Sequence, residues 1–212
     1  MGQSTRRLFV IALAVLSLAG CNKIAAMTGS HGAVTADDMS LGNPNAKVTV
    51  IEYASVACPF CAHFNNDIFP GFKAKYIDTG RIHYVFREML VGNSDEMTTA
   101  AAGFLMARCA GKDKYFSVVD AIFRGQEAMF KSGDVKDALL AIGESTGMTE
   151  AQFNTCINDE AALKALNDRV QTYTTRDGID STPSFVINGK KLVGVPSMAT
   201  LDKAIADAQS AS

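Results

Sequence analysis

Cys58-Pro59-Phe60-Cys61 is the most informative part of this sequence, because it places two cysteines where a strand turns into a helix. Residues 47–53 before it form an apolar, β-branched run, and residues 62–69 after it have a helical pattern. Two thiols two residues apart can close into a reversible disulfide. The N–H groups at the start of a helix favour negative charge, and therefore the reactive thiolate. We predict a redox pair at a strand-to-helix junction.

Each residue of this stretch has an expected part. Cys58, at the helix start, is predicted to attack, and Cys61, one turn later and more buried, to resolve the mixed disulfide. Pro59 fits the first helical turn, where a missing N–H costs nothing. Phe60 supplies no positive charge, so we predict a less acidic Cys58 than a histidine at this position would give. A zinc site is not expected, because a single Cys-x-x-Cys leaves two coordination positions empty.

The composition is that of an ordinary globular protein. The chain has 212 residues, of which 48% are hydrophobic, enough for one domain or for one domain with an inserted subdomain. Its formal net charge is -2, and it has no long run of Lys or Arg. Nucleic-acid binding needs a basic surface. We therefore expect no nucleic-acid partner.

Residues 1–20 have the pattern of a lipoprotein signal peptide. A positively charged start precedes an apolar stretch, Leu8 to Ala19, that is too short for a stable membrane anchor. It ends in Leu18-Ala19-Gly20-Cys21, which resembles the bacterial lipobox, where the cysteine is acylated. The alternative is an ordinary cleaved signal followed by a chance cysteine. Residues 21–40, with few large apolar side chains, are predicted to form a flexible tether between the lipid and the domain.

The cysteine count supports this interpretation of the leader. Five cysteines is an odd number, which in an exported protein indicates a loose thiol or an intermolecular bond. Lipidation of Cys21 leaves an even number. Besides Cys58 and Cys61, the distant Cys109 and Cys156 can then pair as a structural disulfide in an oxidising compartment. The alternative for these two is a pair of buried free thiols.

Two further strand signals flank a helical region. Residues 81–86 alternate like a second strand, and a right-handed crossover would make it parallel to the first. Asn188-Gly189, between two apolar runs, predicts a β-hairpin. Between these signals, residues 95–175 show repeated helical spacing. The sequence therefore predicts strand, helix, strand, helical block and hairpin in that order.

Helix-capping residues mark three helix starts. Asn93 or Ser94 is expected to cap the first helix of the block. Thr149-x-x-Gln152 is a capping box within it. Ser197 is expected to cap a last helix after the hairpin.

This order of elements looks like an α/β thioredoxin fold with an inserted all-helical domain. The chain resembles the DsbA-like thiol:disulfide oxidoreductases of bacterial envelopes over residues 41–212. The resemblance is concentrated in three stretches: Asn43 to Tyr53, Cys58-Pro59-Phe60-Cys61, and Thr182-Pro183-Ser184-Phe185-Val186-Ile187-Asn188-Gly189. It implies two thioredoxin-fold parts, residues 41–94 and 176–212, on either side of the helical insertion at 95–175.

The resemblance also implies roles outside the cysteine stretch. Glu52 would lie buried beneath Cys61 as a proton acceptor, whereas the alternative is a strand-edge Glu that faces water. Pro183 would follow a cis peptide bond and face both sulfurs, with the backbone of Thr182 free to pair with an extended substrate peptide. The alternative is a trans proline at the start of a strand. Pro59 and Phe60 would complete the substrate-binding surface.

Position 60 differs from the family's best-known oxidase, and position 182 does not distinguish oxidases from other members of the family. That oxidase has histidine where this chain has Phe60. Threonine before the proline, as at Thr182, occurs in isomerases and reductases as well as in oxidases. The direction of electron flow is therefore the open point of the resemblance.

We expect a lipid-anchored, periplasm-facing oxidase that donates the Cys58–Cys61 disulfide to the thiols of exported proteins. It would need no cofactor, and a membrane partner of the DsbB type would reoxidise it. A monomer is expected, because the residues before 41 are too few for a dimerisation domain. The near alternative is a reductase or isomerase with the same site. An alternative of another class is a peptide-binding envelope chaperone with incidental cysteines.

Overall fold

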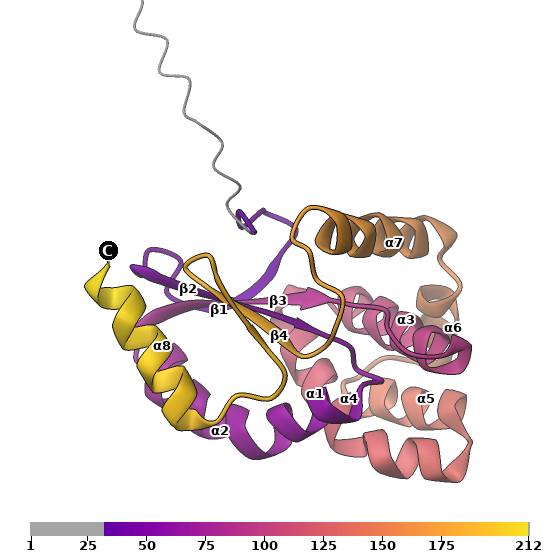
Figure 1. Cartoon of the computed structure of the whole chain (residues 1–212). Helices are drawn as coiled ribbons and strands as arrows, with labels where there is room; N and C mark the ends of the chain where they lie inside the picture. The colour runs from indigo at the N-terminus through magenta and orange to yellow at the C-terminus, as the bar shows by residue number, and fades with distance from the viewer. Residues whose placement is uncertain (1–31, 212) are drawn as a thin grey trace, which may run out of the picture.

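The computed structural model describes residues 32–211, in which helices cover both faces of a five-stranded sheet (Figure 1). The strands are β1 (Met39–Gly42), β2 (Val48–Ala54), β3 (Ile82–Glu88), β4 (Ser184–Ile187) and β5 (Lys190–Val193). The helices are α1 (Pro59–His63), η1 (Phe64–Ile68), α2 (Phe69–Phe72), η2 (Lys73–Ile77), α3 (Ser94–Cys109), α4 (Lys112–Ser132), α5 (Val135–Ser145), α6 (Glu150–Ile157), α7 (Glu160–Thr175) and α8 (Met198–Ser210).

The sheet has the order β1-β3-β2-β4-β5. β2 and β3 are parallel, as the crossover rule predicts, and the other neighbouring strands are antiparallel. β4 and β5 form the predicted hairpin, in which Asn188 and Gly189 have φ values of 44° and 87°. A two-residue hairpin turn requires such positive values. The predicted thioredoxin fold with a helical insertion is therefore confirmed.

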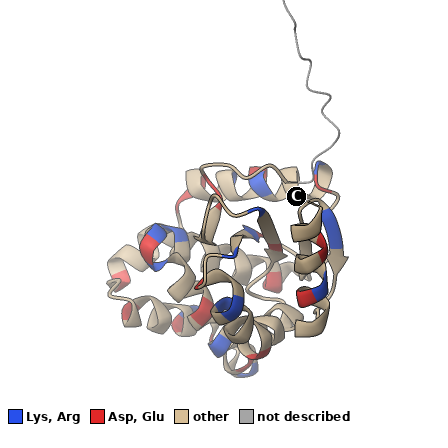
Figure 2. Cartoon of the chain, turned by 90° about the vertical axis from the view of Figure 1, so that its left-hand side faces the viewer, with Lys and Arg blue, Asp and Glu red and all other residues tan. Residues whose placement is uncertain are grey.

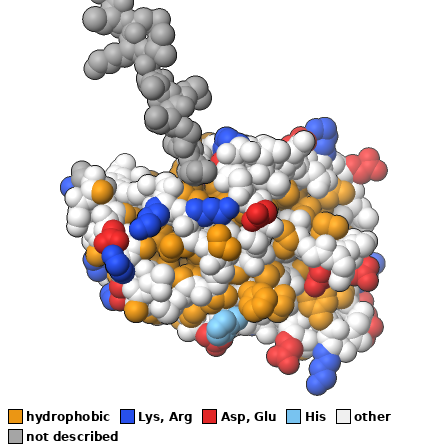
Figure 3. Space-filling view, in the orientation of Figure 1, with side chains coloured by type: hydrophobic (Ala, Val, Ile, Leu, Met, Phe, Trp, Pro, Cys, Tyr) orange, Lys and Arg blue, Asp and Glu red, His pale blue; other side chains and the backbone are white. Residues whose placement is uncertain are grey.

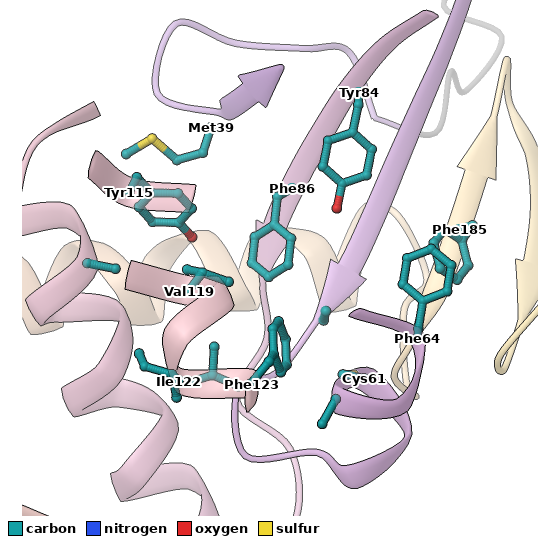
Figure 4. Packing of buried hydrophobic residues seen from close by; sticks show 14 of the residues in the cluster. Met39, Cys61, Phe64, Tyr84, Phe86, Tyr115, Val119, Ile122, Phe123 and Phe185 are labelled. Carbon is teal, nitrogen blue, oxygen red and sulfur yellow. The ribbon is translucent and has the colours of Figure 1, made fainter. Parts of the chain in front are cut away.

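Alternation along β2 assigns its side chains to two faces. Val50, Glu52 and Ala54 point to the face that α1 covers, and Ile51 and Tyr53 point to the other. The larger core lies on the α1 face and continues into the helical block. Figure 4 shows this packing, with Phe64 against Phe185 at a centroid distance of 4.8 Å and Cys61 close by on α1. A buried carboxylate and a buried thiol thus share one face of the sheet.

The helix that carries the cysteines is longer and less regular than the sequence indicates. It runs from Pro59 to Ile77 through α1, η1, α2 and η2, with two π-helical turns. Pro70, near the start of α2, has no N–H to continue the hydrogen-bond ladder. The first π turn directly precedes this interruption, a common way for a helix to accommodate one.

The helical block consists of α3 to α7 and follows the predicted capping signals. Asn93 caps α3 through a capping box with Glu96, and Thr149 caps α6 through one with Gln152. Ser197 caps α8 after the hairpin. Each cap satisfies N–H groups that a helix start leaves unpaired.

The prediction that residues 21–40 form a flexible tether is wrong for the C-terminal part of this range. β1 begins at Met39 and pairs antiparallel with β3. Gly32 packs closely enough that a Cβ there would lie 2.7 Å from Arg87 and Ile51, and its φ of +77° also favours glycine. Residues 32–40 are therefore part of the folded domain, and residues 1–31, which include Cys21 and the expected signal peptide, lie outside the described residues.

Buried Arg87 holds this N-terminal segment. Its guanidinium donates to Asp38 at 2.9 Å, to Asp177 at 3.0 Å and to the Ala33 carbonyl oxygen at 2.9 Å. The Arg87 side chain is fully buried and lies on the sheet face opposite α1. Two carboxylates compensate the buried cation, as burial of a charge requires. This cluster joins the N-terminal segment and the loop after α7 to the centre of the sheet.

The surface carries mixed charge. Acidic and basic residues are interspersed along the helices on the side drawn in Figure 2. Among residues 32–211 there is no helix long and apolar enough to cross a membrane.

Candidate active site

Cys58 and Cys61 lie at the junction between β2 and α1. Cys58 is the N-cap of α1, with Pro59 as the first helical residue, and its carbonyl oxygen accepts from the Cys61 N–H at 3.1 Å. Both cysteines are free thiols. Cys58 is half-buried and Cys61 is fully buried, whereas Phe60 between them is 64% exposed. The helix start thus presents one sulfur to solvent and hides the other.

The Thr182–Pro183 peptide bond is cis and lies beside Cys58. The Cys58 thiol donates to the Thr182 carbonyl oxygen at 3.5 Å. The Thr182 hydroxyl is buried and has no hydrogen-bond partner among the described residues. A buried donor without a partner is costly, and a nearby thiolate would satisfy it. Thr182 and Pro183 therefore lie beside the Cys58 sulfur although they are far from it in sequence.

The two thiols differ in acidity. The Cys61 thiol, together with the Thr182 side chain and the N–H groups of Cys61 and Phe60, lowers the pKa of Cys58 to about 6. Burial raises the pKa of Cys61, and the charge on Cys58 raises it further. At neutral pH Cys58 is therefore mainly a thiolate and Cys61 a thiol. This is the asymmetry that an attacking and a resolving cysteine require.

Glu52 lies in the interior rather than at a solvated strand edge. It is 2% exposed, and its carboxyl accepts a hydrogen bond from the Tyr84 hydroxyl at 2.6 Å. Burial raises the pKa of Glu52 to about 8. A cavity of about 280 Å³ reaches Glu52 and Tyr84, with Asn65 and Asp120 among its polar lining residues. Glu52 is thus a neutral acid at pH 7 with a cavity beside it.

Gln126 is a site residue that sequence reasoning missed. It lies on α4, and its buried amide donates to the Val56 carbonyl oxygen at 2.7 Å and to the Cys58 carbonyl oxygen at 3.1 Å. The helical block thereby fixes the loop that holds Cys58. A signal was present, because Gln126 is a polar residue within the apolar stripe of α4 that contains Ile122 and Met129.

Cys109 and Cys156 form a second cysteine pair, and a disulfide joins them within the helical block. It connects the last residue of α3 to α6 with a Cα–Cα distance of 5.9 Å. Cys109 is exposed and Cys156 is buried. Within residues 32–211, no group of three or more His, Cys, Asp or Glu side chains is placed to hold a metal.

Comparisons with known proteins agree with this geometry. Residues 34–207 match the thioredoxin family. A Rickettsia bellii protein named as a protein-disulfide oxidoreductase is 33% identical over 177 residues, which cover 82% of this chain and 66% of that protein. Disulfide bond formation protein D of Bacillus subtilis is 23% identical over 150 residues, 71% of this chain and 67% of that protein. The chain thus spans somewhat less than two thirds of the Rickettsia relative.

The crystal structure of Wolbachia pipientis alpha-DsbA1 is similar over most of this chain. Its TM-score is 0.73 at 26% identity, over 84% of this chain and 96% of that chain. The match therefore includes the helical block as well as the sheet. This chain belongs to the thioredoxin superfamily and is a DsbA-like member of it.

Proposed function

We propose that this chain is a thiol:disulfide oxidoreductase of the bacterial envelope, and that it acts as a dithiol oxidase. In this role it donates the Cys58–Cys61 disulfide to exported proteins as they fold. The observation that carries the proposal is the opposite pKa shift of the two thiols. A stable Cys58 thiolate favours the reduced form, and this makes the disulfide oxidising.

The reaction takes two thiol–disulfide exchanges. A substrate thiolate attacks Cys58 in the disulfide, so that a substrate–Cys58 bond forms and Cys61 leaves as a thiolate that takes up a proton. A second substrate thiolate then attacks the substrate sulfur of this mixed disulfide, and Cys58 leaves as a thiolate. The substrate loses two electrons to the cysteine pair. A lowered pKa makes Cys58 the better leaving group in this second step.

Glu52 serves the first exchange as a proton donor. Its raised pKa keeps the carboxyl protonated at neutral pH, so it can give a proton to Cys61 as that sulfur departs. The adjoining cavity provides a path by which water can return the proton. In the reverse direction the same carboxylate accepts the proton of Cys61.

The substrate peptide lies extended beside the cis bond. The backbone of Thr182 would pair with it next to Cys58, and the exposed ring of Phe60 and the ring of Pro59 offer apolar contact. Pairing through the backbone does not depend on sequence. It suits an enzyme that acts on many exported proteins.

Location and partners belong to the same proposal. Lipidation of Cys21 would anchor the domain, as a monomer, to an envelope membrane with its site toward the periplasm. A disulfide-bearing membrane partner would take the two electrons from Cys58 and Cys61 and restore the oxidised form. No cofactor takes part in this cycle.

The test is oxidation of a reduced, unfolded disulfide protein by the oxidised full chain. We expect stoichiometric disulfide formation in the substrate and its loss in Cys58→Ser with Cys61→Ser. In Cys61→Ser, the Cys58 thiolate should instead attack the disulfide-bonded form of the substrate, releasing one substrate thiolate and leaving a mixed disulfide that Cys61 cannot resolve. A binding module would be unaffected by these substitutions, and that result would overturn the proposal. Equilibration with glutathione gives the direction of electron flow. A reduction potential of about -120 mV supports an oxidase, and one of about -270 mV supports a reductase.

A further inference from the structure

A cleft of about 580 Å³ opens beside the redox pair, between α1 and the helical block. Ala57 and Pro59, the two chain neighbours of Cys58, both line it. The opposite wall comes from α4, with Phe123, Glu127 and Phe130. The cleft therefore lies next to Cys58.

The two walls of the cleft are fixed to each other. Gln126, which also lines the cleft, binds the Val56 and Cys58 carbonyl oxygens from α4. The α4 wall therefore keeps a defined position relative to the sulfur. A site of this kind can discriminate between substrates, because its groups need no ordering when a ligand enters.

The cleft combines apolar walls with excess negative charge. Glu127 is exposed, and it has no ion pair within residues 32–211. Arg124, also in the lining, is paired at 2.8 Å with Asp120, which lies outside the cleft. Glu96, also in the lining, caps α3 with one carboxylate oxygen. Figure 3 shows hydrophobic side chains with a histidine and acidic side chains over α1.

His63 does not cancel the negative charge of the cleft. His63 pairs with Asp67 at 2.6 Å, and both line the cleft. Their charges cancel when His63 is protonated, and only Asp67 is charged when it is neutral. Glu96 and Glu127 form no ion pair within residues 32–211 in either state.

We propose that this cleft is a subsite for a lysine or arginine side chain of the substrate. That residue would lie within two positions of the cysteine that reacts with Cys58, because an extended peptide advances about 3.3 Å per residue. Its aliphatic stem packs on Pro59, Phe123 and Phe130, and its cation meets Glu127 and Glu96. A substrate glutamate at the same position meets like charge instead.

This subsite rests on the proposed exchange with substrate cysteines, and its test separates the two. The oxidised full chain is mixed with three short peptides that each contain one cysteine and differ only beside it, as lysine, norleucine or glutamate. The rate of mixed-disulfide formation is divided by each peptide's rate with hydroxyethyl disulfide, which corrects for thiol acidity. We expect the lysine peptide to react about fivefold faster than the glutamate peptide at low salt, with a smaller ratio at high salt.

Matched variants assign the preference to the cleft. Glu127→Gln should reduce the lysine-to-glutamate ratio about threefold. Glu144→Gln removes the same charge from exposed α5, outside the cleft, and should leave the ratio unchanged. Phe130→Ala should slow the lysine and norleucine peptides more than Leu163→Ala, whose side chain on α7 is equally exposed at 37%.

The outcomes are distinct. An unchanged ratio in Glu127→Gln, or an equal loss in Glu144→Gln, overturns the subsite. Normal oxidation of dithiothreitol by the wild-type chain with no preference among the peptides removes the subsite and leaves the proposed function standing. A wild-type chain that oxidises neither dithiothreitol nor any peptide refutes the proposed function, and the subsite falls with it.

Discussion

The two cysteine pairs of this protein have different fates. Cys58 and Cys61 are free thiols within the first turn of one helix. Cys109 and Cys156 lie 47 positions apart in sequence, and a disulfide joins them across two helices. Closing a short loop removes little chain entropy, whereas closing a long one removes much more. Loop length therefore makes the second pair a structural crosslink and leaves the first pair easy to reduce.

The groups that surround the cysteines also set the two pairs apart. At the first pair a thiol, a buried hydroxyl and two backbone N–H groups surround Cys58 and lower its pKa to about 6. Cys61, one turn on, has a raised pKa because it is buried. Reactivity thus comes from what surrounds the sulfurs, in addition to their spacing.

Removing the structural disulfide should have the largest effect. For a separation of 47 residues, Cys109→Ala with Cys156→Ala should lower the free energy of unfolding by about 4 kcal/mol, or about a thousandfold in the folding equilibrium. Urea denaturation of the oxidised protein measures this change. Cys58→Ser with Cys61→Ser is the control, and it should not lower the free energy of unfolding by a comparable amount, because closing that short loop removes little chain entropy.

Two results would contradict this prediction. One is an unchanged urea midpoint in the Cys109→Ala, Cys156→Ala variant. The other is mass spectrometry of the wild-type protein, alkylated without reductant, in which Cys109 and Cys156 carry the label. Either result would mean that the sequence separation of the cysteines does not make the Cys109–Cys156 pair a structural disulfide.

Replacing the buried acid should have the next largest effect. Glu52→Gln should slow the departure of Cys61 about a hundredfold, because a neutral amide cannot give up a proton at neutral pH. In the wild type, the rate constant per substrate thiolate should fall above about pH 8, where Glu52 ionises. Stopped-flow measurement across pH should show no such fall in Glu52→Gln. Tyr84→Phe removes only the hydrogen bond that favours the carboxylate, so the fall should move to higher pH.

Glu52 should also make stability depend on pH. The pKa of its folded state, about 8, lies above the ordinary value of 4.5. The folded state therefore binds more protons than the unfolded state between these values. The contribution of Glu52 is full below about pH 4.5 and is lost as pH rises through about 8. The Glu52→Gln protein should lack this decline, and an identical decline in both proteins would remove Glu52 as its cause.

The parts of the fold that could be predicted from sequence rest on local signals. The hairpin follows from Asn188-Gly189 between apolar runs, and the start of α6 follows from the spacing of Thr149 and Gln152. Each signal lies within a few residues of the feature it predicts. The Cys-x-x-Cys at the end of β2 is equally local, so the position of Cys58 and Cys61 at the helix start could be predicted.

The parts that were missed depend on contacts between distant residues. β1 has four residues without a β-branched side chain, and its strand conformation depends on pairing with β3. Asp38 resembles a solvated tether residue until buried Arg87 is placed beside it. Gln126 acquires its role only when α4 packs against the loop at Val56. Such contacts cannot be derived from spacing within one segment.

The smallest predicted effect comes from the residue between the redox thiols. Phe60→His should lower the pKa of Cys58 further, by about one unit or less, because an imidazolium favours the thiolate. The side chain at this position is 64% exposed, so solvent and salt weaken the interaction. One unit corresponds to about 30 mV toward a stronger oxidant. The ultraviolet absorbance of the thiolate gives the pKa, and equilibration with glutathione gives the potential.

Phe60→Gln provides the control, because it has a polar side chain of similar length without charge. The effect of histidine should be largest below about pH 7, where the ring is protonated, and should decrease in high salt. The unfolding midpoint should change little in either variant, since Phe60 points into solvent. If the Cys58 titrations of Phe60→His and Phe60→Gln coincide, the side chain at position 60 does not reach the sulfur. The low pKa of Cys58 would then come from Cys61, Thr182 and the N–H groups at the helix start.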